Sequence, residues 1–188
     1  MKFCMYCGGP LERAIPAGDD RLRHICPNCG IVHYQNPKII AGCIPVWQDR
    51  VLLCRRAIEP RLGYWTLPAG FMELGETLAE AARREAREEA DIEVELESLY
   101  TLFSLPHISQ LYAFFRARMV SEHCAAGPES LEARLFLEEE IPWDELSFAT
   151  VHRSLRLFFQ DRRNGSFVFR LEDLGPDARR LRGEDGAA

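Results

Sequence analysis

Three glutamates, Glu85, Glu88 and Glu89, lie close together in residues 70–91. At positions i, i+3 and i+4 of a helix they would share one face, within an arc of roughly 100°. Like charges one turn apart repel by about 0.2–0.5 kcal/mol on an isolated helix. A divalent cation would remove this repulsion, and carboxylate oxygens suit Mg²⁺ or Mn²⁺, which also bind substrate phosphates. Spacing alone nevertheless favours an ordinary solvated face, because helices rich in Glu, Arg and Ala are common.

A second set of residues suited to metal binding lies at the N-terminus. Cys4, Cys7, Cys26 and Cys29 form two C-x-x-C pairs separated by 18 residues, and each pair is followed by a glycine. Two such pairs close a tetrahedral site without an open coordination position, which is typical of structural zinc. A redox dithiol would explain one pair but not a matched second pair. The segment is poor in apolar residues, so we expect zinc to supply its folding free energy.

The composition limits the class of protein. The 188 residues have room for one full-sized domain and a small additional unit, and 47% of them are hydrophobic, which is enough for a core. A net charge of −6 argues against a protein built to coat nucleic acid. The sequence has no apolar run of 18 residues and no apolar signal segment at its start, so we expect a cytoplasmic protein without a membrane span.

Hydrophobic periodicity predicts the elements that position the glutamates. Residues 38–47, 50–56, 92–105, 110–120 and 131–139 read as strands. Thr77 and Glu80 form a capping box, so a helix should begin at Leu78, and a Glu80–Arg84 pair four residues apart should stabilise it. A second helix is expected to begin near Thr150 and to end at Gly165. This order predicts an α/β (α+β) fold with a mixed β-sheet sandwiched between helices.

The glutamate segment resembles the Nudix box, G-x5-E-x7-R-E-U-x-E-E-x-G-U, where U is a bulky aliphatic residue. The matching positions are Gly70, Glu76, Arg84, Glu85, Glu88, Glu89 and Ile92. Two positions depart from the pattern, because Ala86 is smaller than the usual aliphatic residue and Asp91 replaces the final glycine. Aspartate tolerates the left-handed helix cap better than most residues. Every ionisable position of the box is therefore present.

The resemblance implies hydrolysis of a nucleoside diphosphate derivative, with water attacking phosphorus. Glu85, Glu88 and Glu89 would hold Mg²⁺ or Mn²⁺. The bound metal would lower the pKa of a water molecule that it coordinates. Arg84 would orient Glu76 or Glu85, and Gly70 would shape the loop of the site. The glutamate that acts as general base varies across the family, so the resemblance does not assign it.

Nudix proteins often add an acidic residue from a later loop. Glu129, which follows Gly127 and Pro128, is the candidate in this sequence, and an ordinary exposed loop glutamate is the alternative.

The resemblance extends from about residue 3 to residue 169 and points to a zinc-ribbon Nudix subgroup. It implies a zinc ribbon at 1–36, a Nudix hydrolase domain at 37–170 and a flexible tail at 171–188. That subgroup includes plant plastid pyrophosphatases acting on FAD and ADP-ribose, and bacterial relatives, so FAD or ADP-ribose is the first expected substrate. NADH pyrophosphatases have a similar architecture, but their S-Q-P-W-P-F-P-x-S motif is missing from residues 99–114.

Two other functions remain open. The protein could hydrolyse NADH or remove an NAD cap from RNA, with the ribbon holding the RNA. It could also be a non-enzymatic nucleotide sensor whose ribbon binds nucleic acid or protein, although an intact box argues against a sensor. The ribbon region has five Lys/Arg and three Asp/Glu up to residue 38, without a basic stripe. Structural support or homodimerisation is therefore preferred to nucleic-acid binding as its role.

The substrate contacts that we expect lie before the box. Tyr64 and Trp65 would stack on adenine or flavin, with core aromatics of a strand as the alternative. Arg55 and Arg56 end a predicted strand and would meet phosphates, with a surface position as the alternative for at least one of them.

Overall fold

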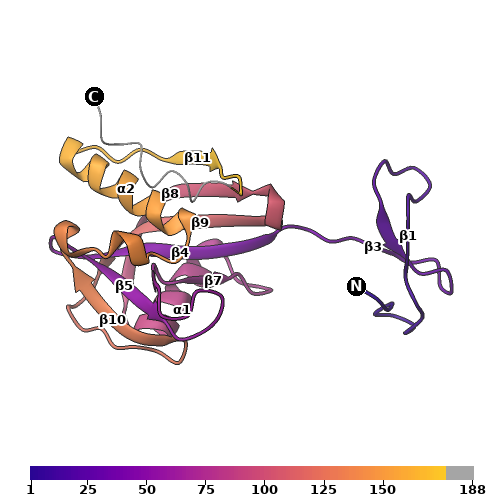
Figure 1. Ribbon diagram of the computed structural model, residues 1–188, viewed down its shortest axis with the longest axis horizontal. Coiled ribbons are helices and arrows are strands. Elements are labelled where there is room, and N and C mark those ends of the chain that lie inside the picture. Colours follow the sequence, from indigo (N-terminus) through magenta and orange to yellow (C-terminus); the bar gives the residue numbers. More distant parts are fainter. Residues whose placement is uncertain (177–188) are drawn as a thin grey trace. The chain divides into compact units, whose positions relative to one another are not determined.

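The computed structural model describes residues 1–176. Within it the chain divides into two compact units, Met1–Pro37 and a second unit that begins at Lys38 (Figure 1). The boundary lies at the Pro37 joint, one residue beyond the ribbon that the sequence predicts. Among residues 1–176, no helix is both long and apolar enough to cross a membrane.

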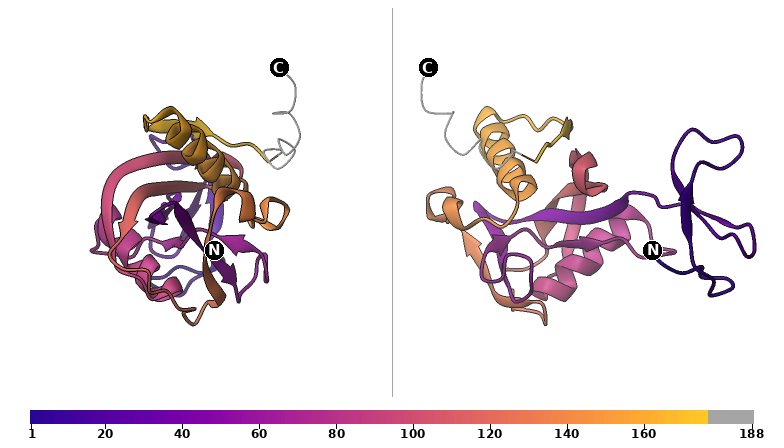
Figure 2. Two further views of the ribbon diagram at one scale, coloured as in Figure 1. Left: turned by 90° about the vertical axis from the view of Figure 1, so that its left-hand side faces the viewer. Right: turned by 45° about the vertical axis from the view of Figure 1, so that its right-hand side comes forward.

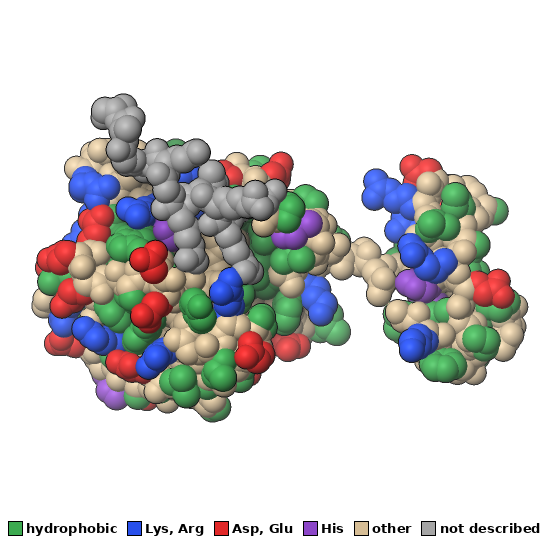
Figure 3. All heavy atoms as spheres, in the orientation of Figure 1, with side chains coloured by type: hydrophobic (Ala, Val, Ile, Leu, Met, Phe, Trp, Pro, Cys, Tyr) green, Lys and Arg blue, Asp and Glu red, His purple; other side chains and the backbone are tan. Residues whose placement is uncertain are grey.

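The first unit is a small three-stranded antiparallel sheet without an apolar core. Its strands are β1 (Glu12–Ala14), β2 (Arg23–Ile25) and β3 (Val32–His33). Phe3, Tyr6 and Tyr34 are 63%, 71% and 63% exposed, and Figure 3 shows hydrophobic side chains on the surface of this unit. The buried hydrophobic residues in this part of the chain are Cys4 and Cys26. Burial of apolar surface therefore contributes little to the stability of this unit.

The second unit is built on one mixed sheet with the strand order β10-β5-β4-β9-β8-β11. Strands β4 and β9 pair in parallel, as do β8 and β11, and the other pairs are antiparallel. Two short strands lie off this path, with β6 on β5 and β7 on β4. The strands are β4 (Lys38–Trp47), β5 (Arg50–Arg56), β6 (Trp65–Thr66), β7 (Ala69–Phe71), β8 (Val94–Leu105), β9 (Gln110–Met119), β10 (Ser130–Phe136) and β11 (Arg170–Asp173). The predicted mixed sheet is confirmed.

Two helices, α1 (Leu78–Ala90) and α2 (Ala149–Asn164), lie on opposite sides of this sheet (Figures 1 and 2). Alternation along the strands supplies an apolar face to each helix. Leu52 joins the cluster that contains Ala86 and Ala90 of α1, whereas Leu53 joins the cluster that contains α2. Residues 38–176 also contain three 3₁₀ helices, namely η1 (Pro106–Ile108), η2 (Glu138–Glu140) and η3 (Trp143–Glu145).

The ends of α1 follow the sequence signals. Thr77 and Glu80 form both hydrogen bonds of the capping box, and Asp91 adopts the left-handed conformation with φ 50° and ψ 42°. The prediction for the start of α2 is wrong, because Phe148 occupies the cap position without a side-chain hydrogen bond and Thr150 is buried in the first turn. Packing of α2 on the sheet replaces the missing cap, since tertiary contacts supply most helix stability.

The predicted flexible tail at 171–188 begins too early. Leu171, as part of β11, pairs with β8, and Leu174 is buried. Arg170 anchors this strand, because its two Nη atoms each donate a 2.6 Å hydrogen bond to the carboxylate of the buried Asp161. Asp161 also accepts hydrogen bonds from the Tyr100 hydroxyl and the Val168 amide. Residues 177–188 lie outside the described part of the chain.

We expect Asp161→Asn to lower the free energy of unfolding of the second unit by about 2–4 kcal/mol, because it leaves the Arg170 charge unpaired against a buried site. Urea unfolding followed by tryptophan fluorescence measures this unit alone, since Trp47, Trp65 and Trp143 all belong to it. Asp173→Asn, at an exposed residue of β11, is the control and should change stability by less than about 0.5 kcal/mol. Equal stability of the two variants would contradict the anchoring role.

Candidate functional site

The three glutamates of α1 lie in two different environments. Glu85 and Glu89 are each only 7% exposed, whereas the Glu88 side chain is 57% exposed. The small buried residues Ala82 and Ala86 bring the helix close to the sheet, so the carboxylates beside them lose contact with water. The interpretation as an ordinary solvated face, which spacing alone favours, is therefore wrong for two of the three glutamates.

Glu89 is the most perturbed of these carboxylates. Burial and the charge of Glu85 raise the pKa of Glu89 to about 8, although a backbone hydrogen bond from Ala69 and the charge of Arg56 act in the opposite direction. Its Oε2 atom is buried and has no hydrogen-bond partner among the described residues. Burying a carboxylate oxygen without a partner costs free energy, and a bound cation would offset that cost. The site therefore fits a hard divalent cation held by carboxylate oxygens.

Arg84 connects the acidic residues of the box. Its Nε and Nη2 donate to both carboxylate oxygens of Glu76, at 3.0 and 2.8 Å. Its Nη1 donates to Glu85 at 2.6 Å and to Glu88 at 2.9 Å, and its Nη2 also donates to the Phe71 carbonyl. The hydrogen bonds from Arg84 hold the pKa of Glu76 at about 2. One guanidinium thus links the loop before α1 to two glutamates of the helix.

The expected Glu80–Arg84 pair does not form. The carboxylate of Glu80 instead accepts hydrogen bonds from the backbone and hydroxyl of Thr77. The capping box and the ion pair compete for one carboxylate, and the cap is local and needs no further ordering of Arg84.

Gly70 brings the backbone against Glu85. A Cβ atom on Gly70 would lie 2.5 Å from both carboxylate oxygens of Glu85, which is closer than atoms can approach. Gly70 belongs to β7, which pairs with β4 through Ala41, so the sheet fixes this position. A side chain at position 70 would therefore displace the Glu85 carboxylate from its present position.

The loop before β10 covers the C-terminal end of α1. The Gly127 amide donates to the Glu89 carbonyl at 3.1 Å, and a Cβ on Gly127 would lie 1.7 Å from the Glu88 carbonyl oxygen. The charge of Glu129 contributes to the raised pKa values of Glu85 and Glu89. The later acidic residue that the sequence suggests is thus within electrostatic reach of the box glutamates.

The residues expected to contact substrate have other partners in the structure. Trp65 is 6% exposed and packs edge-to-face on Phe136 in the core, so no face of its indole is left to stack on a base. The guanidinium of Arg61 lies over the Tyr64 ring, 5.0 Å from its centre. Arg55 is exposed and donates from Nε to the Gly63 carbonyl. Among the described residues, none of Tyr64, Trp65 and Arg55 forms a hydrogen bond or ion pair with a box glutamate.

Of the two arginines that the sequence predicts to meet phosphates, Arg56 is the one whose charge acts on the box glutamate Glu89. The sequence does not single out Tyr112, whose pKa is raised by burial, with the charge of Arg56 acting in the opposite direction as it does at Glu89.

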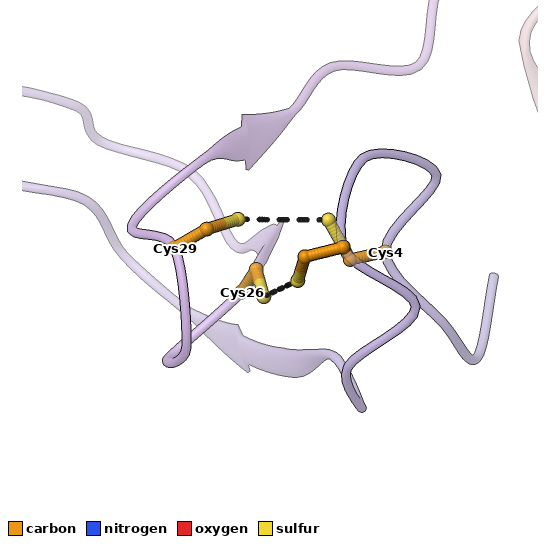
Figure 4. A group of neighbouring side chains, drawn as sticks. Cys4, Cys26 and Cys29 are labelled. Atoms are coloured by element: carbon orange, nitrogen blue, oxygen red, sulfur yellow. Dashed lines mark hydrogen bonds between the residues drawn. The ribbon is translucent and has the colours of Figure 1, made fainter.

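The four cysteines of the first unit come together as predicted. Their Sγ atoms all lie within 4.8 Å of one another, with 3.7 Å between Cys4 and Cys29 and 3.4 Å between Cys7 and Cys26 (Figure 4). A tetrahedral zinc with Zn–S bonds of about 2.3 Å needs sulfur–sulfur distances of about 3.8 Å. His33 Nε2 lies 3.3 Å from the Cys4 sulfur, a contact of the kind that orients metal ligands. The four thiols therefore fit a structural zinc ion.

We expect the purified protein to contain one zinc ion per chain and Cys26→Ser to lose it, because three thiolates leave the buried site incomplete. Elemental analysis measures the zinc, and tryptophan fluorescence should show unchanged unfolding of the second unit, which has its own core. Cys124→Ser, outside the cluster, is the control. Full zinc content in Cys26→Ser would refute the assignment.

The burial of Glu89 predicts a dependence of stability on pH. A carboxyl group whose pKa is higher in the folded state stabilises the fold fully below its unfolded pKa, and this stabilisation is lost as pH rises through the folded pKa. Between the ordinary value of 4.5 and about 8, wild type should therefore lose on the order of 3–5 kcal/mol that Glu89→Gln retains. Urea unfolding at pH 5 and pH 8, without added divalent cations, tests this. Parallel pH profiles for the two proteins would contradict it.

Comparisons with known proteins agree with this geometry. A family model for the Nudix N-terminal zinc ribbon matches residues 2–35, and a model for the NUDIX domain matches residues 36–158. NAD-capped RNA hydrolases NudC from Salmonella heidelberg and Edwardsiella ictaluri are each 34% identical to this chain, over 145 and 146 residues. In both cases the match covers 75% of this chain and 53% of the relative, so the chain spans about half the length of these relatives.

Solved structures show the same fold. A NUDIX hydrolase from Nitrosomonas europaea is 51% identical, with a TM-score of 0.91 over 93% of this chain and 99% of that one. An ADP-ribose pyrophosphatase from Streptococcus suis, at 17% identity, has a TM-score of 0.57 over 74% of this chain and all of that one, a likeness of fold alone. With a family model matching most of its length and the acidic residues of the box gathered on α1, the chain belongs to the Nudix hydrolase superfamily and carries an N-terminal zinc ribbon of the Nudix type.

Proposed function

We propose that this protein hydrolyses the pyrophosphate bond of a nucleoside diphosphate derivative with Mg²⁺ or Mn²⁺. The observation that carries the proposal is the burial of Glu85 and Glu89 side by side on α1, with one Glu89 oxygen lacking a partner among the described residues. A protein that needed the helix only for its fold would be more stable with neutral residues at these two positions.

The residues of the box would have different roles in this reaction. Glu85, Glu88 and Glu89 would hold the cation, which when bound would neutralise the pyrophosphate oxygens and lower the pKa of a water molecule. Arg84 holds Glu85 and Glu88 through hydrogen bonds and fixes Glu76, so the carboxylates are oriented before substrate binds. Gly70 leaves room for the Glu85 carboxylate. A carboxylate that is not engaged by metal would accept the proton of the attacking water, and Glu129 is the candidate outside the helix.

Two groups of substrate are supported by different observations. FAD, cleaved to FMN and AMP, and ADP-ribose, cleaved to AMP and ribose 5-phosphate, follow from the plastid-type resemblance and from the missing NADH motif in residues 99–114. NADH or NAD-capped RNA follows from the curated relatives, which carry the name NAD-capped RNA hydrolase. Both groups contain an adenosine diphosphate, so both reactions break the bond between its two phosphates. A cytoplasmic location, a homodimer and a supporting role for the ribbon stay predictions.

Hydrolysis of FAD, ADP-ribose, NADH and an NAD-capped oligonucleotide, each with Mg²⁺ and with Mn²⁺, tests the function and separates the substrates. We expect AMP, or a 5′-phosphorylated RNA, as a product of at least one reaction. A preference for FAD or ADP-ribose would support the first group, and a preference for either NAD substrate would support the second. Tight binding of these compounds without any turnover would instead indicate a sensor and would refute the enzyme.

We expect Glu85→Gln and Glu89→Gln to lower kcat by at least about 100-fold, because each removes a charged ligand worth several kcal/mol to the transition state. Glu93→Gln, an exposed glutamate just after α1, is the matched control and should leave kcat unchanged. Product release followed by chromatography measures the rates, and circular dichroism checks that the variants fold. Near wild-type turnover in Glu89→Gln would show that the buried pair is not catalytic.

A further inference from the structure

A cavity of about 390 Å³ lies on the face of the sheet opposite the glutamates, between the C-terminal half of α2 and the ends of β4 and β9 (Figure 1). Its apolar wall consists of Val46, Phe158 and Phe167, which belong to or pack against the cluster that contains α2. Ala86 and Ala90 of α1 belong to the cluster on the other face. Among the described residues that line the cavity, none belongs to α1, to β7 or to the loop before β10. The cavity is therefore separate from the candidate active site, and its volume is in the range of pockets that hold small ligands.

Positive charge predominates in this cavity. Its charged lining residues are three arginines, Arg116, Arg118 and Arg162, and one carboxylate, Glu97. Arg116 pairs with Glu97 at 2.5 Å, and Arg118 pairs with Glu95 of the neighbouring strand β8. Three arginines against these two glutamates leave one net positive charge.

Arg162 supplies this remaining charge. Its Nη1 donates to the Asp49 carbonyl at 2.7 Å, and it forms no ion pair with a carboxylate of residues 1–176. The carboxylate of the neighbouring Asp161 is engaged by both Nη atoms of Arg170. A guanidinium that is oriented by a neutral carbonyl keeps its charge and its other N–H donors for an anion.

Arg116 adds a flat surface to the same cavity. Its Cζ lies 3.5 Å from the centre of the Phe167 ring, and its side chain is 23% exposed. Phe167 and Glu97 thus hold a planar group that lines the cavity, and such guanidinium groups stack on nucleobases as they do on aromatic rings. Gln48, in the turn between β4 and β5, adds an amide that can both donate and accept hydrogen bonds, as the edge of a base requires.

We propose that this cavity binds a nucleoside monophosphate, with the base against Arg116 and the phosphate on Arg162. The flat ring of such a ligand suits the apolar wall and the guanidinium of Arg116, and its anionic group suits the unpaired arginine. An inorganic anion would leave the apolar wall uncovered, and a neutral ring would leave Arg162 without a counter-ion. The proposal does not depend on the reaction at the glutamates, because the two sites lie on opposite faces of the sheet.

Titration calorimetry with AMP, without added divalent cations, tests the proposal. We expect Arg162→Ala to raise Kd about 10-fold or more, because a charge-assisted hydrogen bond is lost. Glu97→Gln should instead lower Kd by about 2- to 5-fold, because it removes a negative charge from the partly exposed lining. Arg163→Ala is the matched control, since Arg163 is the next residue of α2 but pairs with Glu138 and does not line the cavity. Its Kd should stay within about twofold of wild type.

Two further comparisons test the chemistry and the location of binding. Adenosine and inorganic phosphate each carry one half of the proposed ligand, and each should bind at least about 10-fold more weakly than AMP, because it loses the contacts of the other half. Glu89→Gln changes the candidate active site alone, so its Kd for AMP should equal that of wild type. Thermal unfolding shows whether each variant is folded, and Glu97→Gln decides alone if Arg162→Ala is not.

A wild type that does not bind AMP at millimolar concentrations would overturn the proposal. Equal Kd values in folded Arg162→Ala and Arg163→Ala would overturn it as well, and so would an unchanged Kd in Glu97→Gln. Inorganic phosphate or adenosine that binds as tightly as AMP would exclude a nucleotide site. A Kd that responds to Glu89→Gln but not to Arg162→Ala would place AMP at the box glutamates and not in this cavity.

Discussion

The burial of two carboxylates between α1 and the sheet is the constraint on which the second unit depends. Charges of one sign in a poorly solvated site repel strongly, and their desolvation raises the pKa values of both Glu85 and Glu89. The surrounding residues make this arrangement tolerable. Arg84 contributes a positive charge beside Glu85, and Gly70 allows the backbone to approach the same carboxylate. The residues of the box therefore form one electrostatic unit rather than a set of independent contacts.

The two units are stabilised by different means. The first exposes most of its large apolar side chains and gathers four thiols, so ligand bonds to a metal would take the place of a core. The second has apolar clusters on both faces of its sheet, and its acidic site contributes repulsion rather than stability. A functional site that weakens its own fold needs a core that is stable enough to carry it.

The helix carries the sequence box common to the superfamily, whereas the loops around it lie outside that box. Residues 57–63 orient Arg56, and the loop before β10 brings Gly127 and Glu129 to the end of α1. Loops tolerate change more readily than the helix they surround, so one box can serve many nucleoside diphosphates. On the proposed function, we expect substrate choice to depend on these two loops.

The sequence by itself determined the local features. The capping box at Thr77, the left-handed Asp91, the four-cysteine cluster and most strands follow from spacing and periodicity, because short-range geometry decides them. Only the tertiary structure decided which glutamates are buried, that Arg84 bonds to Glu76 rather than Glu80, that Trp65 belongs to the core and that Leu171 continues the sheet. It also distinguished Arg56 from Arg55, whose sequence signals are nearly identical. Burial and the choice among charged partners depend on segments far apart in the chain, and no local pattern records which segments will meet.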